Sequence, residues 1–257
     1  MLKAIKRIGL IINYKTFVLL VLSVLSTYFC NYYHIKANFP LTLIATAIVF
    51  PIVFSIGGAY KRRESALDQY GNIKAHGRAL FFAVKHWLPE TSIEAQEEAK
   101  VHLAHLLNSC RKSFTEPLDN LKKNEIGIYE SFDELSMFIK SLRDLGLPSG
   151  EASRANSFLS KMMVSFEKIK HIYQYRTPRT LRTYSQIFII LLPIVYGPYF
   201  ALAAEKYSVY LVYAMPILFS VILVSLDNIQ MHLENPFDQV GEDDVEFNVE
   251  KFIASLK

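Results

Sequence analysis

The chain alternates between long apolar stretches and charged stretches that keep a helical spacing of apolar residues. Four of the apolar stretches contain no Lys, Arg, Asp or Glu. A helix needs about 20 mainly apolar residues to cross a membrane. We therefore expect four transmembrane helices, at Thr16–Tyr33, Leu41–Tyr60, Tyr184–Ala204 and Tyr207–Leu226.

The second apolar stretch runs directly into a charged segment that begins with Lys61, Arg62 and Arg63. The helical spacing continues to Trp87, and Pro89 then ends it. The sequence therefore predicts one long helix that starts in the membrane and continues beyond it. Prolines inside the second, third and fourth stretches are expected to bend or break them, because proline lacks a backbone donor. These prolines are Pro51, Pro193, Pro198 and Pro216.

Within the second stretch, Thr46, Phe50 and Phe54 recur every four residues and form one stripe on a helix. Several copies of this helix around a common axis would make a constriction of phenylalanine rings. Contact with lipid or with a neighbouring helix explains the same spacing. The periodicity alone favours that second interpretation.

The middle of the chain, residues 61–183, is predicted to be helical throughout. Two Ser/Thr-x-x-Glu patterns look like capping boxes that open helices. One opens a helix to about Ser113, and the other opens a helix that ends near Gly146 and Pro148. A further helix runs from about Glu151 to Tyr175, and no segment of this region alternates as a strand does. The two capping boxes are Thr91 with Glu94 and Ser131 with Glu134.

Composition supports an all-α protein with a membrane part and a cytosolic part. Hydrophobic residues make up 51% of the 257 residues and charged residues 20%, with a mean hydropathy of +0.20. Basic residues gather before the first stretch, after the second and before the third. By the positive-inside rule, both termini and the middle region lie in the cytoplasm. A bacterial inner membrane fits the short loops.

The C-terminal tail, residues 227–257, differs in charge from the middle region. Residues 61–183 hold 20 Lys and Arg against 15 Asp and Glu, whereas no Lys or Arg lies between Lys206 and Lys251. The acidic tail is expected to dock on the basic region, to bind a cation, or to stay solvated. Glu242, Asp243, Asp244 and Glu246 crowd four carboxylates into five positions, and calcium takes such oxygen ligands.

Motifs of common enzyme classes are absent from the sequence, including the P-loop, GxGxxG, HExxH, CxxC and GxSxG. His102 and His105 share one helix face and could form a two-histidine metal site or a simple packing pair. Cys30 and Cys110 are far apart in sequence, and we expect no disulfide. The sequence therefore gives no positive support for an enzyme, and no nucleic-acid partner is expected.

Three separated stretches resemble the bestrophins, in particular their bacterial relatives. The first is the second apolar stretch followed by YKRRESALDQYG, in which Arg62 and Tyr70-Gly71 match the family's aromatic and arginine segment, while Arg63 and Glu64 replace its usual tryptophan pair. The second is Thr177-Pro178 followed by Tyr184, and the third is SLDNIQMHLENPF. The resemblance covers nearly the whole chain in order.

This resemblance implies a homopentameric ion channel with one central pore in the lipid bilayer. Each subunit would contribute Thr46, Phe50 and Phe54 to a narrow hydrophobic neck. A second constriction, the cytosolic aperture, would lie near the start of the third span. Anchoring on Thr177-Pro178 places Arg179 there, and anchoring on Tyr184 places Thr180 there.

In animal members of the family, the tail after the Asn-Pro-Phe sequence forms a calcium clasp, which bacterial members need not use. The positions here that match this clasp are Asn235, Asp243, Asp244 and Glu246. Residues 238–240 are an insertion relative to that pattern.

The positive middle region, Arg179 and the phenylalanine edges favour chloride or another small anion as the conducted ion. Two alternatives stay open. One is a cation-selective channel of the same fold, and the other is a non-conducting membrane scaffold that recruits a partner through its acidic tail.

Overall fold

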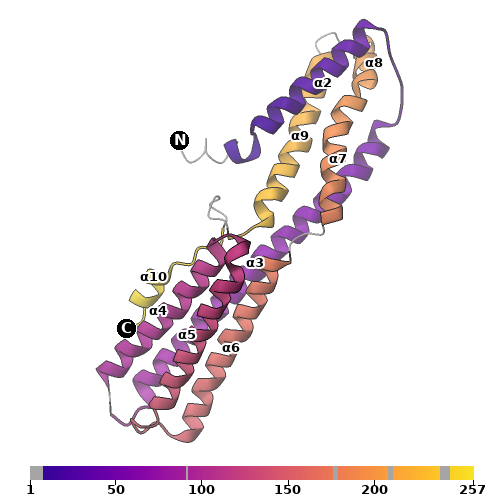
Figure 1. The fold of residues 1–257 in the computed structure, drawn as a ribbon. Coiled ribbons are helices and arrows are strands. Elements are labelled where there is room, and N and C mark those ends of the chain that lie inside the picture. The colour runs from indigo at the N-terminus through magenta and orange to yellow at the C-terminus, as the bar shows by residue number, and fades with distance from the viewer. Residues whose placement is uncertain (1–7, 91, 176–178, 208–210, 238–243) are drawn as a thin grey trace. The chain divides into compact units, whose positions relative to one another are not determined.

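The computed structural model describes residues 8–90, 92–175, 179–207, 211–237 and 244–257. Every regular element in these ranges is a helix, which confirms the predicted all-α class. The elements, shown in Figure 1, are α2 (Tyr14–Tyr32), α3 (Leu41–Trp87), α4 (Ile93–Thr115), the 3-10 turn η1 (Leu118–Asn120), α5 (Leu121–Ser141), α6 (Ser149–Gln174), α7 (Arg179–Val195), α8 (Gly197–Tyr207), α9 (Leu211–Glu234) and α10 (Val249–Ala254).

The chain forms two compact units. Unit 1 comprises Met1–Lys61 and Thr177–Asn235, and unit 2 comprises Arg62–Arg176 and Pro236–Lys257. The long helix α3 is continuous to Trp87, as predicted, so it contributes its first part to unit 1 and the remainder to unit 2. The chain therefore passes from one unit to the other close to the expected end of the second apolar stretch.

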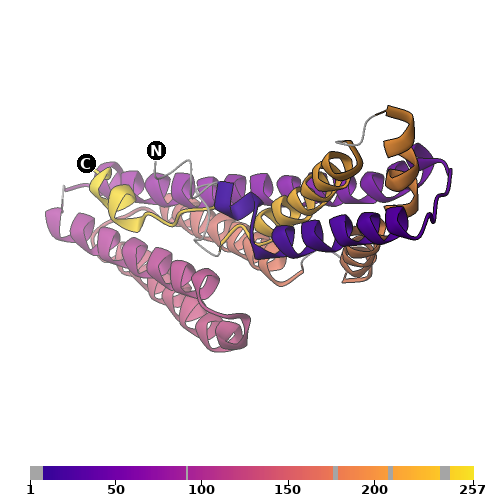
Figure 2. The ribbon, with the colours of Figure 1, turned by 90° about the horizontal axis from the view of Figure 1, so that it is seen from above.

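Unit 1 is built from α2, α7, α8, α9 and the start of α3. In Figures 1 and 2, α2 and α9 lie side by side, and these two helices are in extensive contact. Among the described residues, three helices are long and apolar enough to cross a membrane, at Tyr14–Tyr32, Ile44–Trp87 and Val212–Glu234. A bent pair, α7 with α8, gives a fourth if it counts as one span.

The third expected span is not one continuous helix. It bends by 41° between α7 and α8. Pro198 has no N–H to offer to the carbonyl of Ile194, four residues earlier. The hydroxyl of Ser26 donates to that carbonyl instead, at 2.7 Å. At Pro51, Pro193 and Pro216 the helices α3, α7 and α9 do not break, since each continues through its proline.

Gly197 allows α8 to approach α2 closely at this bend. A Cβ atom at Gly197 would overlap Ser26 Oγ and would lie 3.1 Å from the Ser26 carbonyl carbon and oxygen. Any larger side chain would therefore clash with backbone as well as with a side chain. The helix of the fourth expected span continues beyond Leu226, because α9 (Leu211–Glu234) extends about two turns further, and residues 208–210 lie outside the described ranges.

Unit 2 packs α4, α5, α6 and the second part of α3 around an apolar core. Its helix starts differ from the predicted capping boxes. The cap of α4 is Ser92, whose Oγ accepts from the Ala95 N–H at 3.1 Å, and Thr91 lies outside the described residues. Ser131 is in the interior of α5 and donates to the Gly127 carbonyl at 2.7 Å. The Ser-x-x-Glu pattern at Ser131 therefore lies inside a helix, where the serine hydroxyl donates a hydrogen bond to a carbonyl of the preceding turn.

The described tail residues after Asn235 belong to unit 2 and pack on its helices through apolar side chains. The rings of Phe237 and Phe247 stack on Phe114, with centroids 5.3 and 5.6 Å away. Figure 2 shows this C-terminal segment in yellow. From 245 to 250 the residues alternate, with Val245, Phe247 and Val249 buried and the polar residues between them exposed. The predicted docking of the tail is therefore correct, but apolar contacts and not carboxylates carry most of it.

Candidate pore, aperture and tail sites

The three residues predicted for the pore neck lie together on one exposed face of α3. Thr46 is exposed, and Phe50 and Phe54 have 60% and 63% of their surface exposed. Their rings meet edge to face, with centroids 4.6 Å apart and planes at 81°. A single chain thus presents a continuous stripe made of one threonine and two phenylalanines.

The opposite face of α3 explains why this stripe points outward. Ile48, Ile52 and Ala59 are buried, and the two isoleucines belong to the core of unit 1. A helix with one face fixed in a core must present the other to lipid, to water or to another chain. The two rings on that face expose edges that carry partial positive charge.

The predicted aperture residues lie at the start of α7. Thr180 is exposed on the first turn, and α7 begins at Arg179, whose side chain is outside the described part of the structure, as are Thr177 and Pro178. Arg182, one turn further along α7, forms an ion pair with Glu234. Arg182 Nη1 lies 3.2 Å from Glu234 Oε2, and the Glu234 side chain is only 5% exposed. This ion pair ties the start of α7 to the end of α9.

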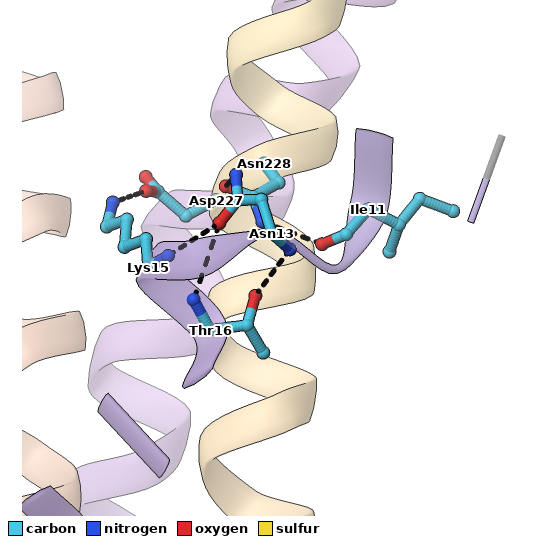
Figure 3. Close-up of polar contacts among 6 residues, drawn as sticks. All are labelled: Ile11, Asn13, Lys15, Thr16, Asp227 and Asn228. Atoms are coloured by element: carbon cyan, nitrogen blue, oxygen red, sulfur yellow. Dashed lines mark hydrogen bonds and ion pairs between the residues drawn. The ribbon is translucent and has the colours of Figure 1, made fainter. Parts of the chain in front are cut away.

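A polar cluster that the sequence did not predict joins the start of α2 to the last turns of α9 (Figure 3). Lys15 forms an ion pair with Asp227, which is 2% exposed. Asn13 Nδ2 donates to Asn228 Oδ1 at 3.2 Å, and Asn228 Nδ2 donates to the Ile11 carbonyl at 2.6 Å. Asn13 also caps α2, since its Oδ1 accepts from the backbone N–H of Lys15 at 3.0 Å.

This α2–α9 polar cluster satisfies groups that would otherwise be buried without partners. Leaving a buried carboxylate such as Asp227 unpaired is costly, because the charge loses its hydration. A signal for the pairing was present in the sequence. Lys15 is the last charge before the first apolar stretch, and Asp227 is the first charge after the fourth. The predicted topology places both at the same edge of the membrane.

The predicted calcium ligands are only partly described. Asn235 Oδ1 is buried and has no hydrogen-bond partner among the described residues. Asp244 is half-buried, Glu246 is exposed, and Asp243 lies outside the described residues. No group of three or more His, Cys, Asp or Glu within the described ranges has the geometry of a metal site.

The two candidate histidines have separate partners. His105 Nδ1 lies 2.9 Å from Glu134 Oε2, and His102 Nε2 lies 3.7 Å from Glu98 Oε1. Cys30 and Cys110 are both free thiols. Burial raises the pKa of Cys110 to about 12, so this thiol is a core residue and a poor nucleophile.

Comparison with solved structures identifies the architecture. A bacterial bestrophin homologue from Klebsiella pneumoniae, in a Tyr-to-Ala variant, superposes with a TM-score of 0.78 at 19% identity, covering 94% of this chain and 97% of its own. The chain has the bestrophin fold. Another structure of a bacterial bestrophin homologue from that organism gives a TM-score of 0.76 at 17% identity, covering 95% and 96% of the two chains.

The bestrophin fold thus covers nearly the whole chain, in agreement with the resemblance found in the sequence. A structure described as a membrane protein gives a TM-score of 0.78 at 17% identity, covering 95% of this chain and 98% of its own. No protein-family model and no curated protein sequence matches the chain. At these identities the likeness establishes the fold, and function has to be argued from the residues.

Proposed function

We propose that the protein is a pentameric ion channel of the bestrophin fold that passes chloride or other small anions across a membrane. Thr46, Phe50 and Phe54 of five subunits form its hydrophobic neck, and Arg179 or Thr180 lines its cytosolic aperture. The chain lies in a bacterial inner membrane with both termini in the cytoplasm. The apolar helices of unit 1 and the bestrophin fold support this proposal.

The observation that carries the proposal is the exposed stripe on α3. Its two large aromatic side chains are more than half exposed, although Ile48 and Ile52 on the other face of the same helix are buried. A ring of such stripes forms a narrow apolar constriction. An ion in it loses water without replacement, so the neck gates by dewetting.

Selectivity for anions follows from the charges around this path. The edges of the phenylalanine rings are electropositive, and the segment from residue 61 to 183 carries the surplus of basic residues. Five arginines at an aperture attract anions and repel cations. Arg182 does not add to this field at full strength, because Glu234 neutralises it.

The test is the current through purified protein in planar bilayers. Phe54→Ala is expected to raise single-channel conductance, because it widens the neck. Phe17→Ala is the matched control: Phe17 is 68% exposed but lies on α2, so its loss should leave conductance unchanged. Equal effects of the two variants would contradict the neck assignment. A monomer in light scattering would rule out a shared pore.

The reversal potential in a tenfold KCl gradient decides between anion and cation conduction. A value near the chloride equilibrium potential supports the proposal, and Arg179→Gln should then shift it towards zero. A value near the potassium potential would keep the channel but make it cation-selective. Absence of current from intact pentamers would favour the scaffold alternative, which a pull-down with and without residues 238–257 would examine.

Calcium binding by the tail is a separate part of the proposal. The buried Oδ1 of Asn235, which has no hydrogen-bond partner in the described ranges, supports it, and Asp243, Asp244 and Glu246 would supply carboxylates. Calcium prefers such a mixture of amide and carboxylate oxygens. Calorimetry should show calcium binding that Asn235→Ala weakens. Unchanged binding in that variant would exclude Asn235 as a ligand.

A further inference from the structure

Unit 2 contains a basic groove between α3 and the C-terminal segment. It has a volume of about 860 Å³, which lies within the range of small-molecule sites. Gly71, Ala75 and Ala79 recur every four residues of α3 and form its floor. A Cβ atom at Gly71 would meet no other atom within 4 Å, so this floor is open.

Three cations line the groove from both sides. Lys74 and Arg78 come from α3, and Lys251 comes from α10. None of the three forms an ion pair with a carboxylate among the residues that the structure describes. Glu246 is the acid among the lining residues, so the groove has a surplus of positive charge.

Two of these cations, Lys74 and Arg78, contact aromatic rings and a hydroxyl. The Lys74 ammonium lies 4.5 Å from the centre of the Tyr70 ring. Arg78 Nη2 donates to Ser255 Oγ at 2.8 Å, and its guanidinium lies 5.9 Å from the centre of the Phe252 ring. These contacts hold the side chains over the groove without neutralising them.

The nearby cations disfavour the charged form of Lys74. Partial burial lowers the pKa of its ammonium, and the positive charges of Arg78 and Lys251 lower it further. A bound anion would relieve this repulsion. Guanidinium and ammonium groups are the side chains that bind phosphoryl oxygens best.

We propose that this groove binds a phosphoryl-bearing polyanion, held by Lys74 and Arg78 of α3 and by Lys251 of α10. The site is distinct from the exposed stripe of α3 and does not depend on the proposed conduction. Because its two walls come from α3 and from the tail, ligand binding would hold the docked tail in place.

Calorimetry with tripolyphosphate at near-physiological ionic strength tests the proposal. Lys74→Gln and Lys251→Gln should each weaken binding roughly tenfold or more, since each removes a charge-assisted contact. Lys122→Gln removes the same charge from an exposed site on α5 and is the matched control. Ala75→Leu keeps every charge but fills the floor of the groove, so it should abolish binding.

The thermal melting temperature of each variant in the absence of ligand shows whether it folds. Equal losses in Lys122→Gln and in the groove variants would overturn the proposal, as would full binding by folded Ala75→Leu. If the unaltered protein bound neither tripolyphosphate nor micelles that contain phosphatidic acid, that would also overturn the proposal. Binding of free tripolyphosphate assigns the site to a soluble ligand. Binding only to micelles that contain phosphatidic acid assigns it to a lipid headgroup.

Discussion

The two units place their polar and apolar residues in opposite ways. Unit 1 exposes many large apolar side chains and buries polar ones, including Thr16, Ser23, Thr27, Asp227 and Asn228. Unit 2 has a mainly apolar core, and its ion pairs are exposed, as for Arg111 with Glu250, or only partly buried, as for Lys170 with Glu125.

This difference shows which solvent each unit is suited to. With no water around a helix bundle in lipid, backbone groups released by a proline must find internal donors, as Ser26 provides for Ile194. In unit 2 water satisfies such groups, and burial of apolar side chains provides the stability. The predictions below test this contrast, from the largest expected effect to the smallest.

Removing a core ring from the tail should have the largest effect. Phe247 is buried, with its ring 4.5 Å from that of Tyr70. Phe247→Ala should lower the free energy of unfolding of unit 2 by about 3–5 kcal/mol, as large-to-small core substitutions do. Glu246→Gln, at the exposed neighbouring position, should change it little. Chemical denaturation of both variants checks this, and similar losses would contradict apolar docking.

The buried ion pair of unit 1 should come next. Lys15→Met leaves the Asp227 carboxylate buried without its partner, at an expected cost of about 3 kcal/mol. Lys15→Met combined with Asp227→Leu should recover most of that loss, because no buried charge remains. SDS-unfolding titrations of the single and double variants measure the coupling. Additive losses would mean that the pair does not act as a unit.

Replacing a glycine by alanine should change the stability of the two units in opposite directions. Gly197→Ala should destabilise unit 1 by about 1–3 kcal/mol, because its Cβ would overlap Ser26. Gly127 is in the interior of α5, and a Cβ there meets no atom within 4 Å. Gly127→Ala should therefore stabilise unit 2 by about 0.5–1 kcal/mol through helix propensity. Thermal melting distinguishes the two, and equal shifts would refute the close approach at Gly197.

A surface ion pair of unit 2 should have the smallest effect. The backbone N–H of Glu250 and then the Arg111 guanidinium hold the pKa of the Glu250 carboxyl below its usual range. A lowered carboxyl pKa stabilises the fold at neutral pH, and that contribution is lost as the pH falls through the lowered value. The protection factors of the α10 amides, which correct for the intrinsic exchange rate at each pH, should therefore fall slightly in acid. Arg111→Gln should weaken this pH dependence without removing it, because the backbone contribution remains, and an unchanged pH dependence would contradict a role of Arg111.

Helix class and the approximate extent of the long helices followed from the sequence. The apolar stretches and the continuous spacing from Leu41 to Trp87 are local signals, and a helix satisfies its own backbone. Capping was less predictable. Ser131 has the sequence of a cap but lies inside α5, because the apolar spacing of that helix begins earlier, at Leu121.

The neck stripe was predictable as a face of α3, since Thr46, Phe50 and Phe54 share one side of any helix. The sequence also indicates how the tail docks, because apolar and polar residues alternate strictly from Val245 to Glu250. The lining of the basic groove had no such signal, because its residues are separated by about 170 positions in the chain: Arg78 bonds Ser255 across 177 residues.

By itself, the sequence determined where helices form, which stretches suit a membrane and which residues share a helix face, because these depend on spacing within a few turns. Only the tertiary structure decided that Lys15 pairs with Asp227, that the third span bends at Tyr196, and that Lys74, Arg78 and Lys251 line one groove. Such contacts depend on which helices pack together, and packing is set by shape and burial across distant segments.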